Sequence, residues 1–65
     1  MENLDRIFFI NRNLKKNGKV SVRSLAVLMD VEEDTVREDI RYMNDRLQAN
    51  IKFKIWKRVC YYPEF

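Results

Sequence analysis

The sequence contains no histidine, and it has only one cysteine, one glycine and one proline. Without a second cysteine no internal disulfide forms, and without histidine the residues of a Cys/His zinc site are missing. We therefore expect no metal and no cofactor. The lone cysteine suits a reducing, cytoplasmic environment. Because glycine and proline are scarce, little of the chain is expected to be loop.

Long apolar runs are absent as well. No stretch approaches the roughly 20 apolar residues that span a bilayer, and none has the charged and then apolar layout of a secretory signal. The 65 residues are 46% hydrophobic and 35% charged, which is typical of a small globular domain. These features predict one domain over residues 1–65 and no membrane partner.

Groups that could carry out catalysis are equally scarce. There is no glycine-rich phosphate loop, and Cys60 falls in an expected strand with no base near it in sequence. The acidic side chains gather at the start of an expected helix, where a favourable interaction with the helix dipole accounts for them. The sequence predicts no catalytic residues, no enzyme activity and no small-molecule substrate.

The net charge of +3 conceals a segregation of charge along the chain. Residues 1–21 carry five basic and two acidic side chains, a balance of +3. Residues 22–47 carry four basic and seven acidic ones, a balance of −3, and residues 48–65 return to +3. A partner attracted by charge therefore meets separate basic and acidic patches.

Apolar residues recur at helical spacing over residues 3–17, 21–29 and 33–47, which predicts three helices. Gly18 is expected to end the first helix in a left-handed conformation, and Ser21 is expected to cap the second. The segment Lys19-Val20 between them is too short to be more than an extended bridge. The expected inner faces are Leu4, Ile7, Phe8, Ile10, Asn11 and Leu14 in the first helix, Val22, Leu25, Ala26 and Met29 in the second, and Val36, Ile40, Met43 and Leu47 in the third.

After Ala49 the apolar period changes to two. The alternation predicts a strand with one buried face, made of Ile51, Phe53 and Ile55. A second short strand is expected from Val59 to Tyr62, where Pro63 ends it. The fold class that follows is α+β, with three helices followed by a two-stranded β-hairpin.

That order is the order of a small winged helix-turn-helix, with the helix-turn-helix over about residues 21–47 and the wing over about residues 50–62. The stretch GKVSVRSLAVLMDVEEDTVREDI resembles the DNA-binding domain of DeoR-type bacterial regulators and the similar domains of WYL-domain and biotin-repressor-like regulators. Cys60-Tyr61-Tyr62 resembles the Gly-Tyr-x end of the family's wing. The residues in register with the family are Arg6, Ile10, Leu14, Gly18, Val20, Ser21, Leu25, Ala26, Met29, Val31, Thr35, Val36, Arg37, Asp39 and Ile40.

Several positions depart from the family's pattern. The turn glycine is Asp30, the serine that caps the recognition helix is Glu32, and the second arginine of Arg-Arg-Asp is Glu38. Two outward positions on the second helix, usually charged, are Val27 and Leu28. These departures place acidic and apolar side chains where the family has others.

The resemblance implies that the third helix enters the major groove of double-stranded DNA, with its first residues facing base edges. The DNA-binding residues expected on this helix are Thr35, Arg37, Glu38 and Arg41. Glu32, Glu33 and Asp34 at its start allow two interpretations. They crowd the phosphates, whose neutralisation supplies much of DNA affinity. They also stabilise the helix through its dipole, whatever its function.

The wing carries a basic and aromatic surface suited to phosphates or to a minor groove. Its expected DNA-binding residues are Lys52, Lys54, Lys57 and Arg58. An alternative interpretation is a solubilising face on an edge hairpin, where lysines deter strand pairing.

Some apolar residues are expected outside the core. Phe9 and Val27 point away from the inner faces of their helices, and Leu28 lies at the flank of its helix. With Trp56 they suggest an interface for a homodimer or for a protein partner. The alternative is that the C-terminal YYPEF folds back and covers Phe9.

The leading functional hypothesis is a small cytoplasmic DNA-binding transcriptional regulator. The brevity of the chain favours a phage or plasmid regulator, or a DNA-binding domain detached from a longer regulator. The alternative is a protein-binding winged helix that uses its acidic third helix as a DNA mimic or as an inhibitor of a DNA-binding protein.

Overall fold

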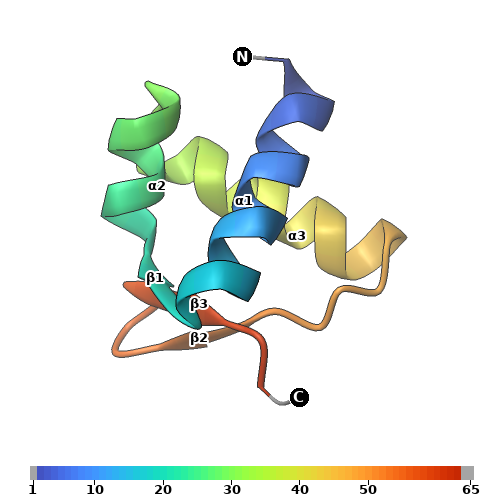
Figure 1. Ribbon diagram of the computed structural model, residues 1–65, viewed down its shortest axis with the longest axis vertical. Helices are drawn as coiled ribbons and strands as arrows, with labels where there is room; N and C mark the ends of the chain where they lie inside the picture. Colours follow the sequence, from blue (N-terminus) through green and yellow to red (C-terminus); the bar gives the residue numbers. More distant parts are fainter. Residues whose placement is uncertain (1, 64–65) are drawn as a thin grey trace.

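The computed structural model describes residues 2–63, which form three helices and a small antiparallel sheet (Figure 1). Both strand pairs of the sheet are antiparallel, and the strand order is β1-β3-β2. This arrangement confirms the predicted α+β winged helix. The elements are α1 (Asn3–Asn17), β1 (Lys19–Ser21), α2 (Val22–Met29), α3 (Glu33–Arg46), β2 (Lys52–Lys54) and β3 (Val59–Tyr61).

The strand β1 corrects the expectation that Lys19-Val20 is a mere bridge and that the sheet has two strands. Val20 pairs with Cys60, so β1 covers the edge of β3 that the hairpin leaves open. A two-stranded hairpin alone is marginally stable, and a third strand with a buried face stabilises it. The pairing joins residues 40 positions apart, which no local pattern in the sequence reveals.

The helix α1 has the predicted bounds and ends at Gly18, whose φ of 83° is one that glycine adopts without steric cost. Three predicted side-chain placements on this helix were wrong. Phe8 is 67% exposed and Leu4 is exposed too, whereas Phe9 packs against the core. Phe8 and Phe9 lie about equally far on either side of the stripe of Ile7, Ile10 and Leu14. Packing of the neighbouring elements, rather than helical period, therefore decides which of them is covered.

The turn between α2 and α3 forms without the family's glycine. Ser21 caps α2, because its Oγ accepts a hydrogen bond of 2.9 Å from the Ser24 N–H. Asp30 takes the left-handed conformation (φ 57°, ψ 48°) that the family gives to glycine. The Val31 N–H then donates to the Ala26 carbonyl over 3.0 Å, and Val31 packs against the core.

The inner face of α3 is confirmed at Val36, Ile40 and Met43, which are buried, but not at Leu47. Leu47 is 55% exposed, because α3 ends at Arg46 and the chain turns away there. The Ala49 N–H donates to the Met43 carbonyl over 3.1 Å, which holds that turn.

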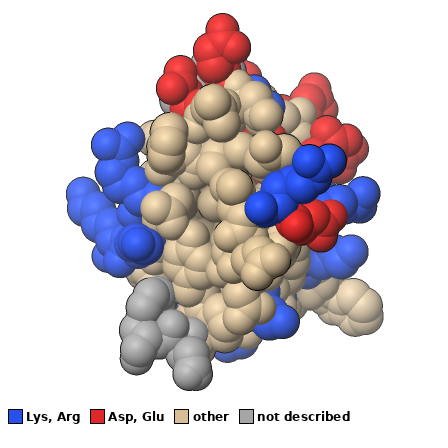
Figure 2. Space-filling model, turned by 90° about the vertical axis from the view of Figure 1, so that its right-hand side faces the viewer, with Lys and Arg blue, Asp and Glu red and all other residues tan. Residues whose placement is uncertain are grey.

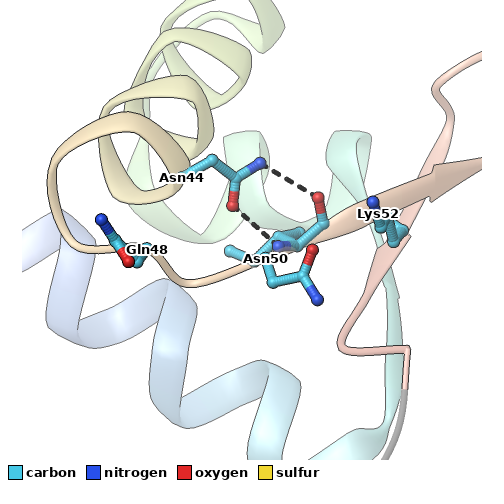
Figure 3. A pocket seen from close by; sticks show the side chains of 5 residues that line it. Asn44, Gln48, Asn50 and Lys52 are labelled. Carbon is cyan, nitrogen blue, oxygen red and sulfur yellow. Dashed lines mark hydrogen bonds between the residues drawn. The ribbon is translucent and has the colours of Figure 1, made fainter.

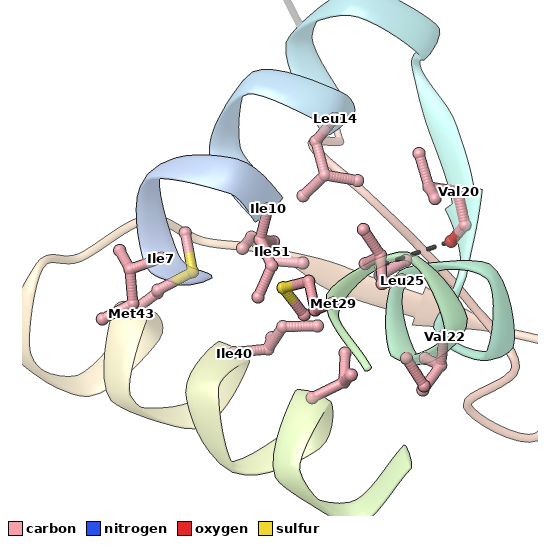
Figure 4. Packing of buried hydrophobic residues seen from close by; sticks show 13 residues of the cluster. Ile7, Ile10, Leu14, Val20, Val22, Leu25, Met29, Ile40, Met43 and Ile51 are labelled. Carbon is pink, nitrogen blue, oxygen red and sulfur yellow. Dashed lines mark hydrogen bonds between the residues drawn. The ribbon is translucent and has the colours of Figure 1, made fainter. Parts of the chain in front are cut away.

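The hydrophobic core lies between the helices and the sheet. In Figure 4, Ile10, Met29, Ile40 and Ile51 converge from different elements. The buried residues are Ile7, Ile10, Leu14, Val20, Val22, Leu25, Ala26, Met29, Val36, Ile40, Met43, Ile51 and Cys60. Among the described residues, no helix is long and apolar enough to cross a membrane.

The strand β2 is shorter than the predicted run from Ile51 to Ile55. Ile51 is buried, and its backbone N–H and carbonyl bond the Asn44 side chain over 2.7 and 3.0 Å (Figure 3). Phe53 is half-buried, as expected for the inner face. Ile55 is 66% exposed, which contradicts its predicted burial, because the chain already turns at this residue.

Burial of Cys60 makes the stability of the fold depend on pH in the alkaline range. The side chain is fully buried and its Sγ donates to the Val20 carbonyl over 3.3 Å. Burial raises the pKa of the Cys60 thiol from 9.0 to about 11. The folded protein therefore keeps a proton that the unfolded chain loses, and stability falls as the pH rises from 9.0 to about 11.

We expect the free energy of unfolding to drop by about 2–3 kcal/mol more in the parent than in Cys60→Ala over this pH range. Urea unfolding at pH 8 and at the upper end of the range measures both proteins. Cys60→Ala leaves the other side chains in place, so the difference reports the thiol together with its coulombic effect on the pKa of Tyr62. Parallel pH profiles would contradict the prediction.

Candidate nucleic-acid interface

The outward face of α3 carries the side chains that the sequence assigned to DNA. Arg37 is half-buried and pairs with Glu33 over 3.3 Å and with Asp34 over 3.2 Å. Thr35 is half-buried, whereas Glu38 and Arg41 are exposed. Two acids at the helix start thus occupy the Arg37 guanidinium, and such exposed helical pairs contribute only about 0.2–0.5 kcal/mol each.

A groove between α3 and the wing brings some predicted residues together. Its volume is about 280 Å³. Arg37 and Arg41 reach it from α3, and Lys57 reaches it from the turn between β2 and β3. The remaining lining residues are Asn44, Asp45 and Phe53. Cations from two separate elements therefore face one groove, which the acidic Asp45 also lines.

No pattern in the sequence predicts Asn44, Asp45 or Phe53 at this site. Phe53 was expected in the core, and its half-buried position lets it reach the core and line the groove at once. Asn44 and Asp45 come directly after Met43, the last buried residue of α3, and no periodicity or motif marks them as site residues. Only the packing of the wing against α3 reveals them.

Another hollow, of about 400 Å³, lies at the start of α3. Arg58 of the wing, Arg23 of α2 and Glu33 of α3 line it together with Ser21. The Val22 N–H donates to the Arg58 carbonyl over 2.8 Å, which ties the base of the wing to the start of α2. The wing thus contributes a cation near the start of α3 as well as in the groove.

The other predicted wing cations lie apart from the groove. Lys52 lines a hollow of about 450 Å³ with Asn44, Gln48 and Asn50 (Figure 3). The Lys54 Nζ lies 5.9 Å from the centre of the Tyr61 ring, over the sheet. Lys57 and Arg58 are therefore better placed than Lys52 and Lys54 to act together with α3.

The surface charges are as segregated as the sequence predicted. In Figure 2, basic side chains gather at the left edge, acidic ones at the top, and both signs meet on the right, with an uncharged surface between them. Val27, Leu28 and Trp56 are exposed, as predicted for interface residues, whereas Phe9 is not. Association through these residues stays a prediction.

A part-buried ion pair joins α3 to α1. The Arg6 Nε donates to Asp39 Oδ2 over 2.6 Å, and the Arg6 Nη2 donates to Asp39 Oδ1 over 3.2 Å. The hydrogen bond to Asp39 raises the pKa of Arg6, so the guanidinium keeps its charge. Asp39 is only 5% exposed, although it follows an outward stretch of α3. The sequence placed both residues in register with the family without pairing them.

Comparison with known families agrees with the helix-turn-helix arrangement of these elements. A model of the DeoR-like helix-turn-helix domain matches residues 6–48. The chain belongs to the DeoR-like helix-turn-helix family. No curated protein and no solved structure matches the chain.

The matched segment of this DeoR-like domain contains both Arg6 and Asp39 and the whole of α3. Membership supports a DNA-binding regulator in general terms. The wing lies outside the match, so its role rests on its own side chains. Among residues 2–63, no group of three or more His, Cys, Asp or Glu side chains is placed to hold a metal ion.

Proposed function

We propose that this DeoR-like domain recognises duplex DNA with α3 in the major groove, while the wing holds the adjacent phosphates. The observation that carries the proposal is the shared groove of Arg37, Arg41 and Lys57. A phosphate seated there would meet cations from both elements, which fixes the orientation of α3 relative to the backbone. Base edges would then be contacted by the first turns of α3.

The acids at the start of α3 are compatible with this function. Arg37 must exchange Glu33 and Asp34 for DNA, and the exposed pairs that it gives up contribute about 0.2–1 kcal/mol each. A bidentate arginine–guanine contact supplies about 1–3 kcal/mol of discrimination against the wrong base. The exchange is therefore favourable at the right base and unfavourable elsewhere, because the acids also repel phosphates.

The alternative function is capture of a basic protein by the acidic start of α3. Glu32, Glu33, Asp34 and Glu38 are exposed, although Glu33 and Asp34 pair with Arg37 and would have to exchange it for such a partner. The two functions predict opposite effects of added positive charge on α3, which makes Glu38 the informative position.

Fluorescence anisotropy at several salt concentrations tests the proposal. It measures binding to duplexes of random sequence and to a site selected from them for tight binding. Arg37→Ala should weaken binding of the selected site by about 1–3 kcal/mol and relax specificity at one base pair. Lys57→Ala should weaken all sequences alike and reduce the salt slope by about one. Glu38→Arg should strengthen non-specific binding, because it removes a charge that repels phosphate.

Lys19→Ala is the matched control, since Lys19 is an exposed cation on β1 that lines none of the hollows described along α3. The proposal fails if the parent binds no duplex even at low salt. If in addition Glu38→Arg weakens capture of a basic protein, the alternative function replaces it.

A further inference from the structure

The tip of the wing presents large apolar side chains directly to solvent. Trp56 is 91% exposed, and Ile55 beside it is 66% exposed. A tryptophan usually buries most of its large apolar surface. Two such neighbours at the end of a hairpin, away from the core, form an apolar tip with no covering in the described part of the chain.

The backbone of this tip is strained. Ile55, Trp56 and Lys57 have φ values of 53°, 57° and 66°, in the left-handed region that side chains other than glycine rarely adopt. For a β-branched residue such as isoleucine this conformation is a marked outlier. The turn is closed by the Arg58 N–H, which lies 3.2 Å from the Lys54 carbonyl and 3.1 Å from that of Ile55. Strain of this kind concentrates at functional sites, where it holds side chains in a fixed presentation.

Cations surround the apolar tip. Lys54, Lys57 and Arg58 flank Ile55 and Trp56 in the sequence, and all of them are exposed. Lys57 also lines the groove with Arg37 and Arg41, so the tip stands beside the outward face of α3. A helix in the major groove has a minor groove on either side, and this is where a wing beside α3 would extend.

We propose that the wing tip inserts Trp56, supported by Ile55, between the bases of a step in the minor groove and bends the duplex. This inference rests on the proposed function. Apolar side chains that enter the minor groove unstack a base step and kink the DNA, and flexible pyrimidine–purine steps yield most readily. The wing would then recognise the deformability of DNA rather than its base edges.

The charges select DNA over other occupants. In a second copy, the tip would bring Lys54, Lys57 and Arg58 against the same cations, which repel one another. DNA combines negative phosphates for these cations with flat apolar base faces for the indole ring. An anionic membrane surface also attracts cations and tryptophan, and the test separates it from DNA.

The chain has one tryptophan, so indole emission, excited at a wavelength that the three tyrosines do not absorb, reports on the tip alone. The parent is titrated with random duplexes of about 25 base pairs, while anisotropy measures binding and energy transfer between labelled duplex ends measures bending. We expect the indole emission to be quenched as the duplex binds and the DNA to bend by about 20–90°. Netropsin, a small minor-groove ligand, should remove both signals while leaving residual binding.

Trp56→Ala should lose the bend and weaken binding about tenfold or more, within the range that base stacking supplies. Because the Trp56 side chain is exposed, the thermal melt of Trp56→Ala should match that of the parent. Lys54→Ala is the matched control on the same hairpin. It should lower affinity and the salt slope but keep both the quenching and the bend.

Duplex binding without quenching or bending would overturn the inference and leave the proposed function standing. Failure of the parent to bind any duplex would overturn the proposed function, and the inference with it. A blue shift of the emission with phosphatidylserine vesicles, with no quenching by DNA, would assign the tip to a membrane surface instead.

Discussion

Ile40→Asp is expected to abolish folding. Ile40 is fully buried on the inner face of α3, in the same core cluster as Val36 and Met43. An ionised carboxylate there would have no cation among the surrounding apolar side chains, and burial of an unpaired charge costs many kcal/mol. A core of this size rarely supplies more than about 3–5 kcal/mol of stability. The free-energy cost of the substitution therefore exceeds the free energy of unfolding of the domain.

A circular dichroism melt measures this result. The parent should unfold cooperatively, whereas Ile40→Asp should show no transition and little helix at any temperature. Tyr42→Asp is the matched control, because Tyr42 lies on the exposed side of the same helix and should keep a cooperative melt. A melt of Ile40→Asp as steep and as high as that of the parent would mean that the inner face of α3 is assigned wrongly.

Arg6→Met is expected to destabilise the protein by about 2–4 kcal/mol, below the range for fully buried pairs because Arg6 is partly exposed. The side chain of Arg6 is 18% exposed and that of Asp39 is 6% exposed. Loss of the guanidinium leaves the Asp39 carboxylate buried without its charged partner. The same change removes the ion pair that joins α3 to α1. The position of α3 relative to the wing should then become less fixed, and the groove between them less well formed.

Urea unfolding of Arg6→Met, Asp39→Leu and the double variant measures the coupling between the two side chains. The double variant should recover much of the loss, because apolar residues of similar size replace a buried ion pair with little penalty. Arg37→Met serves as the control, since its ion pairs are exposed and should change stability by less than about 1 kcal/mol. Equal effects of Arg6→Met and Arg37→Met would show that burial of the pair contributes nothing.

The acidic start of α3 is one of the features in which this chain departs from the family's pattern. The spacing of α3 suits a DNA groove, whereas the acids at its start repel phosphates. In the free protein, Arg37 pairs with two of these acids, Glu33 and Asp34. The single Arg37 charge offsets one of these two negative charges in the free protein, and Glu38 and Arg41 are exposed beside the pairs. Whether α3 contacts DNA or protein then depends on how readily Arg37 changes partner, which the binding series on Arg37 and Glu38 measures.

The sequence by itself determined the three helices and the hairpin that follows them, but not the strand β1 between α1 and α2. Helical period, a capping serine and a terminating glycine act within a few residues, so the bounds of α1 and α2 and the start of α3 followed from local chemistry. The resemblance carried by residues 18–40 determined the family for the same reason, because its motif is contiguous.

Only the tertiary structure decided which side chains meet. The pairing of Val20 with Cys60, the Arg6–Asp39 ion pair and the groove shared by Arg41 and Lys57 join residues far apart in the chain. Helical spacing placed Phe8 inward and Phe9 outward, and packing reversed the two. Burial and pairing depend on which elements lie side by side, and periodicity within one element contains no information about its neighbours.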